Sequence, residues 1–122
     1  MIITREIIKK KLVDWQENRL TNKQIKEWAE EIYDNKGTLY ADDEWEEGNK
    51  VSVTREILES LTSLDMNLGL VEDVPIYLEF LKAEPGNYAL GFHKWNIALN
   101  SINYQERKAK LKEIDFYSRF CI

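Results

Sequence analysis

Apolar residues recur along most of this chain at intervals of three and four, the spacing that places them on one face of an α-helix. The clearest early stripe is typical of a core-facing helix and consists of Ile25, Trp28, Ala29, Ile32 and Tyr33. It follows a capping-box pattern in which the side chains of Thr21 and Gln24 each accept the backbone N–H of the other. We therefore predict a helix that begins at Thr21 and ends before Gly37, a residue type common just after helices.

Similar stripes predict helices in the rest of the chain. Residues 4–18 carry Ile8, Leu12 and Trp15 on one face, residues 51–64 carry Ile57, Leu61 and Leu64, and Pro75 suits the first turn of a short helix over 75–83. A fifth helix is predicted from Tyr88, Phe92, Trp95, Leu99 and Ile102, and a sixth, capped by Asn103, from Leu111, Ile114 and Tyr117. Because strand alternation is nowhere sustained, we predict an all-α fold, a compact bundle of five or six helices with no significant sheet, as a single domain over residues 1–122.

One segment, residues 37–49, has no helical period and is filled with acid: Asp42, Asp43, Glu44, Glu46 and Glu47 surround Trp45. We expect it to form a loop with at most one helical turn. The acid extends beyond this loop, because residues 27–86 contain sixteen Asp and Glu against four Lys and Arg, a net charge of −12 in a chain of net charge −5. Such a field favours a basic partner through electrostatic steering.

The acidic segment has two interpretations. An acidic run is most often solvated surface, and Trp45 can fold back to cover a groove between helices. Alternatively, tryptophan is a preferred anchor of protein interfaces, and acid around an exposed Trp45 suits insertion into a cationic cleft. On the second interpretation the candidate binding residues are Asp42, Asp43, Glu44, Trp45, Glu46 and Glu47, together with Glu72 and Asp73 at the predicted start of the fourth helix.

The sequence contains no motif for several classes of function. The five glycines never form a phosphate-binding pattern, and His93 is the only histidine, which removes the usual zinc and di-iron motifs. The single cysteine, Cys121, excludes an internal disulfide and a thiolate zinc site. We therefore expect no enzymatic activity, no cofactor, no metal and no small-molecule substrate. The net negative charge argues against nucleic acid and membrane partners, and with no signal peptide at the start we expect a cytoplasmic protein.

With these elements placed, the chain resembles the small helical immunity proteins of bacterial polymorphic toxin systems, of the contact-dependent growth inhibition type. The resemblance covers residues 4–82 and rests on Thr4-Arg5-Glu6, Trp15, Trp28-Ala29, the acid-rich connection, and the segment Val71-Glu72-Asp73, Tyr77-Leu78 and Phe80-Leu81. It implies a stoichiometric inhibitor that binds a cognate toxin domain and occludes its active site. A nuclease toxin would present a basic cleft that complements the acidic segment. An acidic helical adaptor or regulatory protein that binds another basic protein surface is the alternative.

Overall fold

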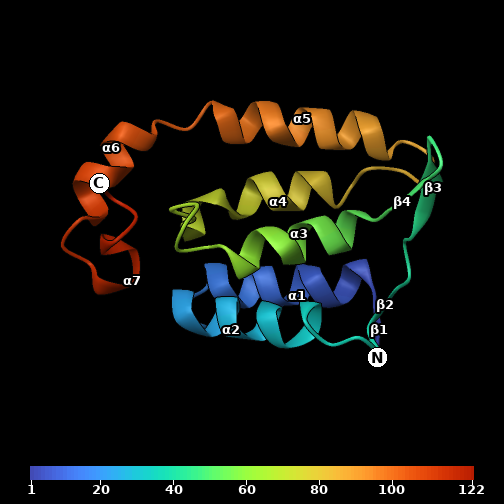
Figure 1. Ribbon diagram of the computed structural model, residues 1–122, viewed down its shortest axis with the longest axis horizontal. Helices are drawn as coiled ribbons and strands as arrows, with labels where there is room; N and C mark the ends of the chain where they lie inside the picture. The colour runs from blue at the N-terminus through green and yellow to red at the C-terminus, as the bar shows by residue number, and fades with distance from the viewer.

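The helical stripes of the sequence form stacked layers in the computed structural model, which describes residues 1–122 (Figure 1). Helices α1 (Arg5–Gln16) and α2 (Asn22–Tyr33) lie at one side, α3 (Val53–Thr62) and α4 (Val74–Phe80) in the middle, and α5 (Tyr88–Asn100) on the other side. Two shorter helices, α6 (Tyr104–Leu111) and α7 (Asp115–Ser118), lie across one end of these layers. The predicted helical architecture is confirmed.

Local capping sets where the long helices begin. Thr21 accepts from the backbone N–H of Gln24 at 3.1 Å, and the Gln24 side chain accepts from the Thr21 N–H at 2.9 Å, so the predicted capping box is present. Asn103 caps α6 as predicted, because its Oδ1 accepts from the N–H of Glu106. Gly37 does not follow the end of α2 directly, because that helix ends at Tyr33 and the Thr38 hydroxyl then donates to the carbonyl of Ile32 at 2.8 Å.

The main core is a cluster of eighteen buried side chains contributed chiefly by the four helices α1 to α4. The predicted inward residues of α1 and α3 are all buried, among them Trp15, whose indole N–H donates to Asn22 Oδ1 at 2.8 Å. Trp28 is only half-buried at the edge of this core, where the Lys11 ammonium lies 5.4 Å from its ring centroid. Burial of this apolar surface is the main force that holds the layers together.

Helix α5 packs on α4 through aromatic rings. Trp95 stacks on Phe80 of α4 with ring centroids 4.8 Å apart, and the rings of Tyr88 and Phe92 lie 6.1 and 6.3 Å from that of Phe80. The two segments approach closely at Gly91, where a Cβ atom would lie 2.7 Å from the Cβ of Ala83. The fifth predicted stripe is therefore a real packing face, although α5 itself ends at Asn100, before Ile102.

The acidic segment is not the irregular loop that we expected, and the fold contains two small sheets. Strands β1 (Ile2–Ile3) and β2 (Leu39–Tyr40) pair in parallel, whereas β3 (Glu44–Glu46) and β4 (Asn49–Val51) form an antiparallel hairpin. The expectation of no significant sheet is thus corrected, because the fold contains two pairs of strands, and each strand is two or three residues long. Both pairs lie at the end of the layers opposite to α6 and α7 (Figure 1).

The C-terminal third docks through a buried ion pair. Asp73, in the 3₁₀ turn η1 (Val71–Asp73), accepts from both terminal nitrogens of Arg107 in α6, at 2.7 and 2.5 Å. Arg107 also donates to the carbonyl of Leu68, and the Tyr117 hydroxyl donates to the carbonyl of Gly69 at 2.5 Å. Ile114, expected to face inward, is exposed, because the chain leaves α6 at Lys112 and begins α7, a seventh helix, after Ile114.

No helix in this fold combines the length and the apolar character that crossing a membrane would require.

A tryptophan pair tests the assignment of the core. We expect Trp15→Ala to lower the free energy of unfolding by about 3–5 kcal/mol, because it empties a fully buried site. The control is Trp45→Ala, which removes the same side chain from a position that is 73% exposed and should leave stability within about 0.5 kcal/mol of the parent. Urea unfolding followed by circular dichroism measures both, and equal losses would contradict the assignment.

A second pair tests the docking of the C-terminal third. Asp73→Ala leaves the buried Arg107 without its carboxylate, which we expect to cost about 3–5 kcal/mol of unfolding free energy. Glu72→Ala changes the neighbouring exposed carboxylate, which makes no ion pair, and should cost about 0.5 kcal/mol or less. If the two variants unfold at the same urea concentration, the Asp73–Arg107 pair does not hold this layer in place.

Candidate protein-binding surface

The hairpin β3–β4 protrudes from the end of the helical layers and is the most distinctive surface feature of the protein (Figure 1). Its register pairs Glu46 with Asn49, which leaves a two-residue turn of Glu47 and Gly48. Both turn residues have positive φ, 51° and 81°, as a type I′ turn requires. A non-glycine residue in this conformation carries a local cost on the order of 1 kcal/mol, and such costs concentrate at functional sites.

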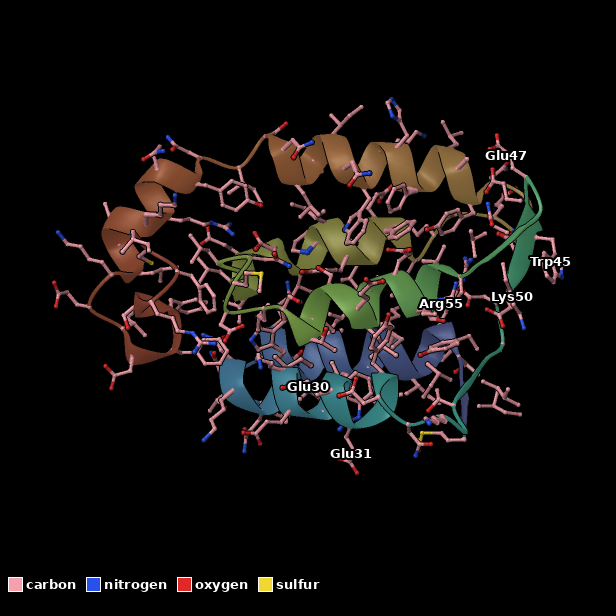
Figure 2. All side chains as sticks on the ribbon, in the orientation of Figure 1. Glu30, Glu31, Trp45, Glu47, Lys50 and Arg55 are labelled. Carbon is pink, nitrogen blue, oxygen red and sulfur yellow. The ribbon has the colours of Figure 1, made fainter.

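Trp45 lies on the outer face of this hairpin. Its exposed fraction is 73%, which is larger than that of any other aromatic residue for which we expected a role in binding or packing. Figure 2 shows it pointing away from the helices, with Lys50 nearby. Lys50 is the cross-strand partner of Trp45, so the two side chains share a face. The alternative expectation, that Trp45 folds back over a groove between helices, is wrong.

The carboxylates of the hairpin strand lie on the opposite face from Trp45, because successive residues of a strand alternate. Glu44 and Glu46 are half-buried, and the Glu44 carboxylate accepts from the backbone N–H of Gly86 in the turn between α4 and α5. Glu47 is exposed at the tip (Figure 2). None of these three carboxylates has a cationic partner. Acid therefore lies behind and beside Trp45 rather than as a ring around it.

Asp42 has a structural role at the foot of the hairpin. Its carboxylate accepts from Arg5 at 3.1 Å, from the Ser52 hydroxyl at 2.5 Å and from the Thr54 hydroxyl at 2.7 Å. It also accepts from the backbone N–H of Thr54 at 3.1 Å, in the first turn of α3, where an anion is favoured. Burial opposes ionisation of Asp42, but these hydrogen bonds outweigh it and hold its pKa below the usual range.

Further contacts fix the hairpin against the helices. Asp43 forms an ion pair with Lys50 at 3.1 Å across the two strands. The Arg55 guanidinium, in α3, donates to the carbonyl of Lys50 at 2.7 Å and lies 6.0 Å from the ring centroid of Tyr40. Figure 2 shows Arg55 and Lys50 at the junction between α3 and the hairpin. Trp45 is therefore presented on a rigid support, which reduces the ordering cost of binding.

Apolar side chains extend the surface on the same end of the molecule. Ile2 and Leu39 pair directly in the sheet β1–β2 and are 59% and 60% exposed. This sheet and the hairpin lie at one end of the layers and are joined by residues 41–43 (Figure 1). An exposed aromatic residue, neighbouring exposed aliphatic residues and unpaired carboxylates are the composition of a protein interface with a charged rim.

The remaining candidate residues do not join this surface. Asp73 is buried against Arg107, and Glu72 beside it is exposed. Both belong to η1, which directly precedes α4 at the end of that helix farther from the hairpin. His93 is exposed on α5, and Cys121 Sγ lies at the other end of the molecule, where it contacts the carbonyl of Tyr117. No group of three or more His, Cys, Asp or Glu side chains is arranged to hold a metal ion.

Sequence reasoning missed Lys50 and Arg55, which brace the hairpin. The only local signal was Gly48, a residue type that readily adopts positive φ in a turn, and strands of three residues on either side of it are too short to show alternation. Comparison with protein-family models, curated proteins and solved structures found no match for this chain.

The lowered pKa of Asp42 predicts a dependence of stability on pH. Because the folded pKa lies below the unfolded value of 3.8, the ionised carboxylate stabilises the fold above pH 3.8, and this stabilisation is lost as pH falls through the folded pKa. We expect Asp42→Asn to be less stable than the parent at pH 7 and to lose less stability between pH 5 and pH 2.5. Urea midpoints at several pH values measure this. A loss of equal size in both proteins would contradict it.

Proposed function

We propose that this protein is an immunity protein, which binds and neutralises a cognate toxin domain by inserting the β3–β4 hairpin into a basic cleft. The observation that carries the proposal is the exposed Trp45 on a braced hairpin whose carboxylates Glu44, Glu46 and Glu47 lack cationic partners. The resemblance to helical immunity proteins supports the same function, since it covers the helices and the acidic connection that carry this hairpin.

The chemistry of the hairpin suits a nuclease toxin. A cleft that binds nucleic acid is lined with cations that contact phosphates, and the hairpin carboxylates complement such cations. Trp45 supplies a large, rigid anchor that fills a pocket without much loss of conformational entropy. The protein acts in this scheme by occupying the cleft and needs no catalytic residue of its own.

The alternative is an acidic adaptor that binds another basic protein through the same surface. The two functions differ in the partner and in the consequence of binding. An immunity protein is encoded next to its toxin, forms a complex of one to one stoichiometry and abolishes the toxin's activity, whereas an adaptor leaves its partner active. Binding and inhibition assays with the toxin domain encoded by the adjacent gene separate them.

We predict that anchor and charge variants of the hairpin have different kinetic effects. Trp45→Ala should speed dissociation from the toxin domain by about 30-fold, which corresponds to the loss of about 2 kcal/mol at a hot spot. The pair Glu46→Gln with Glu47→Asn removes two charges, and asparagine suits the type I′ turn, so the hairpin geometry is retained. This double variant should slow association at low salt, and the difference should disappear near 1 M salt, where the Debye length falls to about 3 Å.

The matched control is Glu31→Gln with Glu113→Gln, which removes two exposed, unpaired carboxylates outside the hairpin. Figure 2 shows Glu31 on α2, away from the hairpin. Surface plasmon resonance across a range of salt concentrations measures all variants. If the hairpin variants associate and dissociate like the parent, the toxin binds elsewhere.

A further inference from the structure

Helix α5 is an outer layer of the fold, and its outward side is apolar. It packs chiefly on α4, and no other helix or strand lies over its outward side (Figure 1). Leu90 and Ile97 follow the buried residues Tyr88 and Trp95 by two positions, which is a rotation of about 200° around the helix axis. They therefore lie opposite the core, and they are 55% and 54% exposed. A surface helix normally carries polar residues on that side.

An apolar groove adjoins this side of α5 along its junction with α4. Its volume is about 460 Å³, and most of its wall is apolar, with Ile76 and Ala83 on one side and Leu90 and Ala98 on the other. Leu90 belongs both to the groove and to the outward side of α5, so the two form one continuous surface. We call this surface, made of Ile76, Ala83, Leu90, Ile97 and Ala98, the α5 face. A continuous apolar surface of this kind marks an interaction site.

Helix α5 carries no acidic residue, which sets it apart from the rest of this acidic chain. No Asp or Glu occurs between Tyr88 and Asn100, although the chain as a whole has a net charge of −5. Two copies of an acidic chain repel each other, so they can approach most easily where neither contributes acid. The α5 face therefore suits contact with a second copy of this chain, whereas the acidic hairpin does not.

The rim of the groove carries charges of both signs that are unused within the chain. Lys94 of α5 and Glu84, in the turn between α4 and α5, both line the groove and are exposed. The one ion pair on this rim joins Lys82 to Glu79, which leaves Lys94 and Glu84 without partners. In a two-fold dimer each contact occurs twice, so a single Lys–Glu contact between copies gives two ion pairs. The rim is thus complementary to itself.

We propose that two copies of this chain associate through their α5 faces, with the two α5 helices antiparallel about a two-fold axis. Leu90 of each copy packs against Ile97 of the other, and Lys94 of each copy pairs with Glu84 of the other. The antiparallel direction follows from the rim charges. It places the two α4–α5 grooves on the same side of the helix pair, where Lys94 can reach Glu84, whereas a parallel pair would place the grooves on opposite sides.

The size of the α5 face is compatible with a dimer. A standard interface takes about 800 Å² from each partner, which is roughly a tenth of the accessible surface of 7560 Å² of this chain. Helix α5 is about 20 Å long, and the face with its groove is about two helix diameters wide, which gives an area of the same order.

The dimer would leave both hairpins free. The hairpin lies near the beginning of α5, where Glu44 contacts Gly86 (Figure 1). An antiparallel pair of α5 helices therefore places the two hairpins at opposite ends of the dimer, and each can bind one partner protein. The proposed dimer goes beyond the proposed function and does not depend on it.

Sedimentation equilibrium of the whole chain tests the association. The protein is examined between about 2 and 200 μM in 150 mM salt. We expect the average mass to rise with concentration from the chain mass of 14.5 kDa toward twice that value, with a dissociation constant in the micromolar range. A mass that stays at that of one chain over the whole range would overturn the proposal.

A pair of isoleucine variants locates the contact. Ile97→Glu places a carboxylate in the apolar contact without a cation to pair with it, and should weaken the dimer by about tenfold or more. The matched control is Ile114→Glu, which makes the same change at an isoleucine that is 46% exposed and lies outside α5. It should dimerise within about twofold of the parent, and circular dichroism verifies that both variants fold. Equal dimerisation of the two variants would overturn the proposal.

Charge reversal tests the antiparallel direction. Glu84→Lys and Lys94→Glu each place like charges at both proposed ion pairs, and each alone should weaken the dimer about fivefold. An equal mixture of the two variants restores opposite charges at both contacts and should dimerise as tightly as the parent. A mixture that dimerises no more tightly than the single variants would contradict this arrangement. None of these substitutions changes the hairpin, so their results are independent of the kinetic test of toxin binding.

Discussion

The carboxylate of Asp42 joins parts of the chain that no local rule brings together. It holds Arg5 at the start of α1 and binds the first turn of α3 through Ser52 and Thr54. Arg5 in turn donates to the carbonyls of Leu81 and Ala83, after the end of α4. One half-buried charge pair thus connects three helices to the foot of the hairpin. Removing either partner would destabilise the fold, because the remaining half-buried charge would lose its counter-charge.

The position of this network explains how a protein with small strands can present a rigid binding surface. A two-stranded hairpin is marginal by itself in water. Here its foot is held by Asp42, its second strand by Arg55, and its first strand by the contact of Glu44 with Gly86. The helices therefore supply the stability, and the hairpin supplies an exposed aromatic residue and unpaired acid.

Acidic residues that look equivalent in the sequence have different roles in the structure. Asp42 and Asp73 each hold an arginine that is distant in the chain, and Asp73 is buried whereas Asp42 is half-buried. Glu46 and Glu47 have no such partner and remain available to a basic protein. The strongly acidic central segment is thus partly structural. Its field is weaker than the net charge of that segment indicates, since Arg5 and Arg107 neutralise it from outside the segment.

The sequence by itself determined the helices, because their signals are local: apolar spacing identified the core faces, and Thr21 and Asn103 identified two helix starts. It did not reveal the hairpin, since strands of three residues show too little alternation to be distinguished from a loop. Nor did it distinguish the structural Asp42 from the exposed Glu47, because the burial and pairing of a carboxylate depend on residues that are distant in the chain. Arg5, for example, lies 37 positions from Asp42. Long-range packing decided which acids fold the protein and which face a partner.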